Sequence, residues 1–301
     1  MPEKGLPDYR RYRVEAGGPF FRREGDFLVQ VPRHRFGAQG QRLLPRRTPG
    51  RLRLVLLGES SAWMLGDELG VVAGQRGLQE RIETVNMALG ASSWELVQRR
   101  FEEALGLDAD AILVLFGHNL YIAVHPLHAP RLPAAPGSRL ASLALDLLDP
   151  PRFPQGMLPA GRVLALRAGL RRMARQARRR GVRLLLCTVP SNLRQPPGGT
   201  ARADYQEAER LWKAGRWQEA RRLFVRARDL DPERLRASTA VNEAIRSVAR
   251  DEGAELLDFE RLVSARGEHG VPGPELFKDG QHLRPEGLRW EAGRLLELLR
   301  L

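Results

Sequence analysis

Cysteine is nearly absent from this chain and occurs once in 301 residues, at Cys187. A single thiol permits no intramolecular disulfide and no cysteine-rich metal cluster. Because Cys187 lies in the apolar run RLLLCTVP, we predict a buried structural thiol rather than a nucleophile. Long hydrophobic runs are also absent, and the N-terminal segment MPEKGLPDYRRYRVEAGG has no apolar core of the kind found in signal peptides. We therefore expect a cytoplasmic protein with no membrane span.

Lysine is rare as well. It is found only at Lys4, Lys213 and Lys278, so arginine supplies almost all of the formal net charge of +13. The arginines are spread through predicted helices together with Glu and Asp. The densest run, RRMARQARRR at 171–180, fits the exposed face of a helix better than a nucleic-acid module. We therefore expect no nucleic-acid partner.

Short apolar runs rich in Val, Ile and Leu alternate with long segments of helical periodicity. This alternation is typical of an α/β fold, in which helices cover both faces of a central parallel sheet of about five strands. The predicted strands are residues 52–57, 84–89, 111–116, 183–189 and 254–259. The main predicted helices are 67–81, 93–105, 163–180 and 286–299, with Ser92 or Ser93 as a cap and Pro285 in a first turn.

The predicted organisation is one main domain with three additions. Residues 1–50 form an N-terminal appendage in which RREGDFLVQVPRHR suggests a hairpin against the sheet edge, and the main domain covers 51–301. Repeated prolines in 121–161 leave little room for helix or central strand, so we predict a lid there. The third addition, 203–232, is a helical hairpin inserted in the main domain.

The packing residues of segment 203–232 resemble those of one tetratricopeptide repeat. They are Ala208, Leu211, Gly215, Trp217, Ala220, Phe224, Ala227 and Pro232. A single repeat cannot bury a continuous face alone, because solenoids need about three. The hairpin therefore either walls the active site or shields the sheet, which we favour, or binds a protein partner.

Polar and small residues follow the first three predicted strands. The first strand ends in GES, which places Ser60 at a strand-to-helix turn, at the sheet edge where open α/β folds bind ligands. The second is followed by Gly90 and the third by Asn119, so two backbone N–H groups and one side-chain amide could stabilise an oxyanion. Each residue alone could equally be a helix cap or a turn.

Near the C-terminus, Asp279 and His282 are separated by two residues just before the last predicted helix. An imidazole oriented by a carboxylate is suited to proton transfer near neutral pH. This pair alone could be an ordinary surface loop. Together with Ser60 it supplies the nucleophile, base and acid of a serine-dependent site.

Four ordered blocks resemble the SGNH hydrolase family: GES at 58–60, Gly90, GHN at 117–119 and DGQH at 279–282. The stretch VPSNLRQPP, the helical hairpin and the ending GVPGPELFKDGQHLRPEG resemble a bacterial subgroup with tetratricopeptide repeats. The resemblance implies a flavodoxin-like α/β/α sandwich.

In the site that the resemblance implies, Ser60 is the nucleophile, His282 the base and Asp279 its orienter. The oxyanion hole comprises the N–H groups of Ser60 and Gly90 and the side chain of Asn119. The implied substrate is a small-molecule or glycan ester, hydrolysed through an acyl-enzyme without cofactor or metal. An O-acyltransferase, and a non-catalytic scaffold that binds a protein through the hairpin, remain alternatives.

Two positions depart from the family pattern. Glu59 replaces the usual Asp of the first block, and Leu120 follows Asn119 where Asp or Glu is common. We predict Glu59, His118 and Asn192 as substrate-binding residues, with a structural role for His118 equally open. The spacing of His125 and His128 around a proline is not a recognised metal motif.

Overall fold

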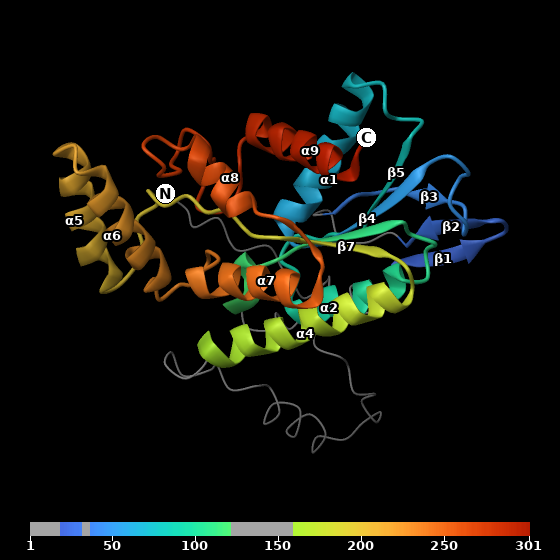
Figure 1. The fold of residues 1–301 in the computed structure, drawn as a ribbon, viewed down its shortest axis with the longest axis horizontal. Coiled ribbons are helices and arrows are strands. Elements are labelled where there is room, and N and C mark those ends of the chain that lie inside the picture. Colours follow the sequence, from blue (N-terminus) through green and yellow to red (C-terminus); the bar gives the residue numbers. More distant parts are fainter. Residues whose placement is uncertain (1–18, 32–36, 122–158) are drawn as a thin grey trace, which may run out of the picture.

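A computed structural model describes residues 19–31, 37–121 and 159–301, with only the backbone of 159 and 160 (Figure 1). Its centre is a five-stranded sheet in the order β5-β4-β6-β7-β8, in which every neighbouring pair is parallel. The strands are β4 (Leu52–Gly58), β5 (Ile82–Asn86), β6 (Ala111–Leu115), β7 (Arg183–Cys187) and β8 (Glu255–Leu257). The predicted parallel sheet of about five strands is confirmed. The predicted lid at 121–161 lies almost wholly outside the described residues.

Helices cover both faces of this sheet, so the fold is a three-layer α/β/α sandwich (Figure 1). One layer contains α1 (Ser60–Gln75), α8 (Phe259–Arg266) and α9 (Pro285–Leu299). The other contains α2 (Trp94–Ala104), α4 (Pro159–Arg179) and α7 (Thr239–Glu252). The central strands β4, β6 and β7 are almost completely buried between the layers, which explains their continuous apolar sequences.

The helix boundaries agree with the sequence at the later helices and differ at α1. Ser93 caps α2 by accepting the backbone N–H of Leu96 at 3.3 Å, and Pro285 occupies the first turn of α9. Helix α1, however, begins at Ser60 rather than at residue 67 and ends at Gln75 rather than at 81. Glycines in this segment weaken its helical pattern, but Gly66 is needed because a Cβ there would overlap the side chain of Asn86.

The N-terminal appendage contains a small antiparallel sheet of β1 (Phe21–Glu24), β2 (Phe27–Gln30) and β3 (Arg42–Leu43). The side chain of Gln41, next to β3, bonds to the outer edge of β5. Its Nε2 donates to the carbonyl of Asn86 and its Oε1 accepts the N–H of Asn86, both at 2.8 Å. The appendage therefore covers part of one edge of the main sheet.

The segment predicted as a helical hairpin forms α5 (Ala201–Lys213) and α6 (Trp217–Asp229), joined through Gly215 with a φ of 74°. The pair projects from one end of the molecule (Figure 1). Its small apolar core includes Phe224 and joins the main domain through Leu193 and Val271. The hairpin enters and leaves the domain at one place, because a Cβ on Gly199 would lie 3.0 Å from Pro232. Its kinship with tetratricopeptide repeats stays a prediction.

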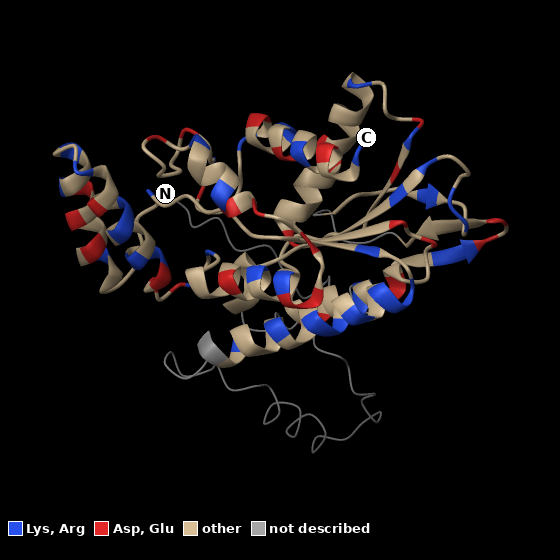
Figure 2. Cartoon of the chain, viewed as in Figure 1, with Lys and Arg blue, Asp and Glu red and all other residues tan. Residues whose placement is uncertain are grey.

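The arginine-rich run of α4 is paired with acidic groups. Arg171 donates to Asp251 at 3.1 Å, and Arg175 donates to Glu252 at 2.7 Å, both at the end of α7. Figure 2 shows the basic positions of α4 (blue) beside acidic positions at the end of α7 (red). These contacts join neighbouring helices on the same face of the sheet. None of the helices among the described residues combines the length and the apolar character that crossing a membrane would require.

Candidate active site

Ser60 lies where β4 passes into α1. The turn needs glycine at position 58, because Gly58 has a φ of 147° and a Cβ there would overlap the carbonyl oxygen of Leu115. Ser60 is the first residue of α1 and is partly exposed. Its hydroxyl is therefore accessible at the carboxyl edge of the parallel sheet, where ligands bind in open α/β folds.

The imidazole of His282 lies between Ser60 and Asp279. Nε2 of His282 is 2.7 Å from Oγ of Ser60, and its Nδ1 is 2.7 Å from Oδ2 of Asp279. With the Nδ1 proton donated to the carboxylate, Nε2 is free to accept the serine proton. The structure thus joins two residues 222 positions apart in the sequence by one hydrogen bond.

The loop that presents the imidazole is internally hydrogen-bonded. Oδ1 of Asp279 accepts the backbone N–H groups of Gln281 at 2.8 Å and His282 at 2.7 Å. Partial burial acts to raise the pKa of Asp279, but hydrogen bonds from His282 and Gln281 outweigh it and hold that pKa below its usual value. Asp279 therefore stays ionised and fixes the orientation of the imidazole.

The three predicted oxyanion donors stand at the ends of β4, β5 and β6. The N–H of Leu89 donates to the carbonyl of Gly58 at 3.3 Å, which holds Gly90 beside the β4–α1 turn. Nδ2 of Asn119 donates one hydrogen to the carbonyl of Ser92 at 3.2 Å and has a second hydrogen to offer. The backbone N–H groups of Ser60 and Gly90 donate to no acceptor within the described part of the chain.

Glu59 has a different place from the predicted substrate contact. It is fully buried, and its carboxylate accepts three backbone N–H groups, from Gly117 at 3.1 Å and from His118 and Asn119 at 2.8 Å each. Burial raises the pKa of Glu59 to about 7, although these three hydrogen bonds act to lower it. Glu59 therefore holds the turn that presents Asn119.

His118 and Asn192 are also buried, with 1% and 3% of their surfaces exposed. Nδ1 of His118 accepts the backbone N–H of Ala237 at 3.0 Å, and burial lowers the pKa of this imidazole to about 3, so it is neutral. Asn192 donates from Nδ2 to the carbonyl of Asp279 at 3.1 Å. In this structure both residues contact backbone groups rather than an open cleft.

A model of the GDSL-like lipase/acylhydrolase family matches residues 56–290, a span that includes every residue named for the candidate site. The chain belongs to the GDSL-like lipase/acylhydrolase family. It is thus an enzyme of the esterase and acylhydrolase type. No curated protein matches this acylhydrolase.

Solved structures share its fold at low identity. A Bacteroides fragilis protein assigned as an acylhydrolase is 12% identical, with a TM-score of 0.51 over 85% of this chain and 90% of that chain. A GDSL-like lipase from Bacteroides thetaiotaomicron, also 12% identical, has a TM-score of 0.47 over 85% and 90%. An acetyl xylan esterase has a TM-score of 0.49 at 12% identity over 82% and 100%. At 12% identity, the likeness to the Bacteroides fragilis structure is one of fold alone.

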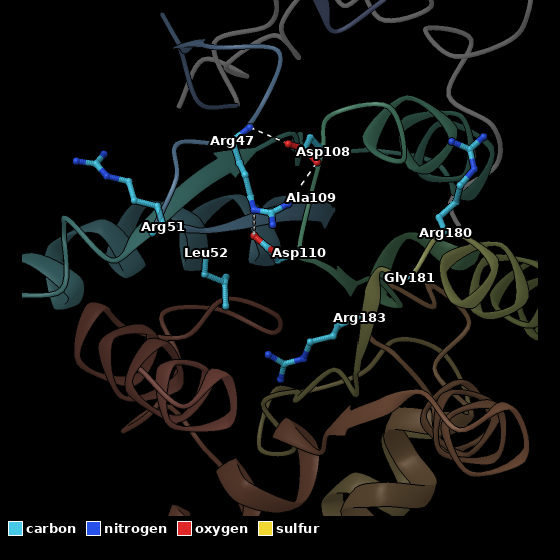
Figure 3. Close-up of a pocket in the computed structure, with 10 residues that line it drawn as sticks. Arg47, Arg51, Leu52, Asp108, Ala109, Asp110, Arg180, Gly181 and Arg183 are labelled. Carbon is cyan, nitrogen blue, oxygen red and sulfur yellow. Dashed lines mark hydrogen bonds and ion pairs between the residues drawn. The ribbon is translucent and has the colours of Figure 1, made fainter.

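A cavity of about 660 Å³ in this acylhydrolase lies at the opposite end of the strands. Figure 3 shows the residues that line it. Leu52 and Arg183, the first residues of β4 and β7, help to line it, whereas Ser60 follows the carboxyl end of β4. Its arginines are largely neutralised: Arg47 pairs with Asp108 and Asp110, Arg51 with Glu80, and Arg183 with Glu255. We therefore assign no ligand to this cavity.

Nothing in the described part of this acylhydrolase resembles a metal centre, since no three His, Cys, Asp or Glu side chains are grouped there as ligands. His125 and His128 lie outside those residues. Arg236, which was not predicted from the sequence, is a buried arginine with hydrogen bonds close to the His282 loop. No sequence motif marks Arg236, because its partners near this loop are backbone carbonyls.

Proposed function

We propose that this enzyme hydrolyses a carboxylic ester or O-acyl group through a Ser60–His282–Asp279 triad and an acyl-enzyme. The observation that carries the proposal is the 2.7 Å separation of Ser60 Oγ and His282 Nε2, with Asp279 on the other imidazole nitrogen at 2.7 Å. A nucleophile hydrogen-bonded to a base, with the base oriented by an acid, is the arrangement that activates serine for acyl transfer in many unrelated folds.

In the first half-reaction, Nε2 of His282 accepts the proton of Ser60 as Oγ attacks the ester carbonyl. The carbonyl oxygen becomes an oxyanion, for which the donors are the N–H groups of Ser60 and Gly90 and the second amide hydrogen of Asn119. The imidazolium, paired with Asp279, then gives its proton to the departing alcohol. The products of this half are the free alcohol and an ester on Ser60.

The second half-reaction regenerates the enzyme. His282 takes a proton from water, the resulting hydroxide attacks the acyl-enzyme, and the same donors hold the second oxyanion. Collapse of this intermediate returns the proton to Ser60 Oγ and releases the acid. If an acceptor hydroxyl replaced water at this step, the same residues would perform O-acyl transfer.

Active-site labelling tests the proposal with a matched neighbouring serine. The variant Ser60→Ala removes the proposed nucleophile, whereas Ser61→Ala removes a buried hydroxyl that has no hydrogen-bond partner among the described residues. We expect a fluorophosphonate to label the wild type and Ser61→Ala, and not Ser60→Ala. Labelling of Ser60→Ala would contradict the proposal. Turnover of p-nitrophenyl acetate that requires an added hydroxyl acceptor would identify a transferase. A wild type that is neither labelled nor active on the ester would identify a non-catalytic scaffold.

A further inference from the structure

The segment 231–238 connects the helical hairpin to α7. It contacts two parts of the proposed active site, the loop that carries His282 and the turn that carries Asn119. We call it the connector. On one side, the side chain of Gln281, next to His282, donates to the connector carbonyl of Leu235. On the other, the connector N–H of Ala237 donates to His118, and Ser238 lies 3.2 Å from the hydroxyl of Tyr121. The connector therefore joins the His282 loop to the turn that holds Asn119.

Arg236 is the buried anchor of the connector, with 4% of its surface exposed. Its Nη2 donates to Asp231 at 2.9 Å, and its Nη1 donates to the carbonyls of Asn192 and Gln195, each at 2.9 Å. The methylene groups of Arg236 also lie against Gly280, where an added Cβ would be 3.5 Å from Cδ. One side chain thus fixes the segment after β7 and packs on the His282 loop.

Asn192 continues this path to the proposed triad. Its backbone N–H donates to the carbonyl of Gly280 at 3.1 Å, and its Nδ2 donates to the carbonyl of Asp279 at 3.1 Å. Oδ1 of Asn192 accepts the N–H of Arg194 at 3.0 Å, which fixes the orientation of the amide. Both bonds to the loop end on backbone carbonyls next to the carboxylate that orients His282.

We propose that Arg236 and Asn192 are positioning residues, which hold Asp279 and His282 in register with Ser60 through the path Asp231–Arg236–Asn192–Asp279. This inference rests on the proposed function. Small displacements of catalytic groups can cost about 100-fold in rate. Loss of the path therefore lowers kcat while substrate binding, which uses other groups, is retained.

A second buried arginine provides the control that distinguishes a positioning role of Arg236 from a purely structural one. Arg228, also 4% exposed, bonds to Glu260 at 3.1 Å and to Thr239 at 2.8 Å, near the start of α7. Within the described ranges, Arg228 forms no hydrogen bond or ion pair with the His282 loop. The variant Arg228→Met therefore removes a comparable set of buried bonds without breaking the path.

The test compares folded variants of the full chain. Arg236→Met alone leaves the buried carboxylate of Asp231 without its cationic partner, and such a loss destabilises proteins strongly. The double variant Asp231→Asn/Arg236→Met is therefore included to remove that charge. We expect both to lower kcat for p-nitrophenyl acetate and the fluorophosphonate labelling rate by about 10- to 100-fold, with little change in KM. Asn192→Ala follows the same pattern, Arg236→Lys recovers part of the rate, and Arg228→Met keeps it.

Two outcomes would overturn the inference, and they are distinguishable. If the wild type is labelled and active while a folded double variant matches it, the path does not position the triad. The second outcome is a rate loss in Arg228→Met as large as that in Arg236→Met, at equal melting temperature. Both losses would then be attributed to general destabilisation and not to loss of the path. If the wild type itself neither reacts with the probe nor hydrolyses esters, the proposed function fails first.

Discussion

The carboxylate of Glu59 accepts the backbone N–H of Asn119 at 2.8 Å. It also accepts the N–H groups of the two preceding residues, so a single acid supports the whole turn that follows β6. A carboxylate that accepts several backbone donors is a strong local anchor. Glu59 is the residue before Ser60, and it thereby connects the proposed nucleophile to a proposed oxyanion donor.

Stability should depend on the ionisation of Glu59. Burial raises its pKa from 4.5 to about 7, so the folded state favours the protonated form relative to the unfolded state. This contribution is fully present below about pH 4.5 and is lost as the pH rises through about 7. Between these limits the free energy of unfolding should fall by roughly 3 kcal/mol relative to Glu59→Gln. Urea unfolding of both proteins across this range measures the difference. Parallel pH profiles would contradict the assignment.

Removing the side-chain donor of Asn119 should lower activity more than stability. Loss of one oxyanion donor typically costs about 2.7 to 4 kcal/mol of transition-state stabilisation, or roughly 10²- to 10³-fold in kcat. We expect this loss for Asn119→Ala with p-nitrophenyl acetate, while Ser60 remains reactive to a fluorophosphonate at a reduced rate. An unchanged kcat would remove Asn119 from the oxyanion hole.

The turn before Ser60 should reject any side chain. Gly58→Ala forces a Cβ onto the carbonyl of Leu115 at a φ that favours glycine, so we expect a loss of about 3 kcal/mol or more in unfolding free energy. Gly70 on α1 is the matched control, because it is exposed and a Cβ there meets nothing within 4 Å. Gly70→Ala should be neutral or stabilising by up to about 1 kcal/mol. Thermal unfolding of the two variants tests this contrast. Equal changes in stability for Gly58→Ala and Gly70→Ala would refute the prediction.

The helical hairpin should be removable without dismantling the triad. Its two ends meet, since the N–H of Gly198 donates to Asp231 at 3.3 Å, so a short glycine linker can replace residues 201–229. Excision exposes Leu193 and Val271, and Val271→Ser in the excised form should restore solubility lost for that reason. We expect fluorophosphonate labelling to persist. If labelling disappears in a folded excised form, the hairpin itself supports catalysis.

The sheet and the residues of the proposed triad both leave local signals in the sequence. Buried parallel strands require continuous apolar runs, and the polar residues at their ends, such as Ser60 and Asn119, follow those runs directly. Asp279 and His282 are separated by only two residues, so a tight loop brings them together.

The roles of Glu59, Asn192 and Arg236 could not be predicted in the same way. Their partners are mainly backbone N–H and carbonyl groups, which every residue possesses and which no motif marks. A sequence reader sees polar side chains near a site and expects substrate contacts. Only the folded backbone shows that these side chains are buried and already bonded.

The side-chain amide of Gln41 occupies, at the outer edge of β5, the place that the peptide group of another strand would take. An open strand edge is a template on which further chains can add, and it is a common starting point for aggregation. By exchanging two hydrogen bonds with Asn86, this single glutamine terminates the sheet at that position. The N-terminal appendage thus hinders the pairing of another chain with the edge of β5 at this position.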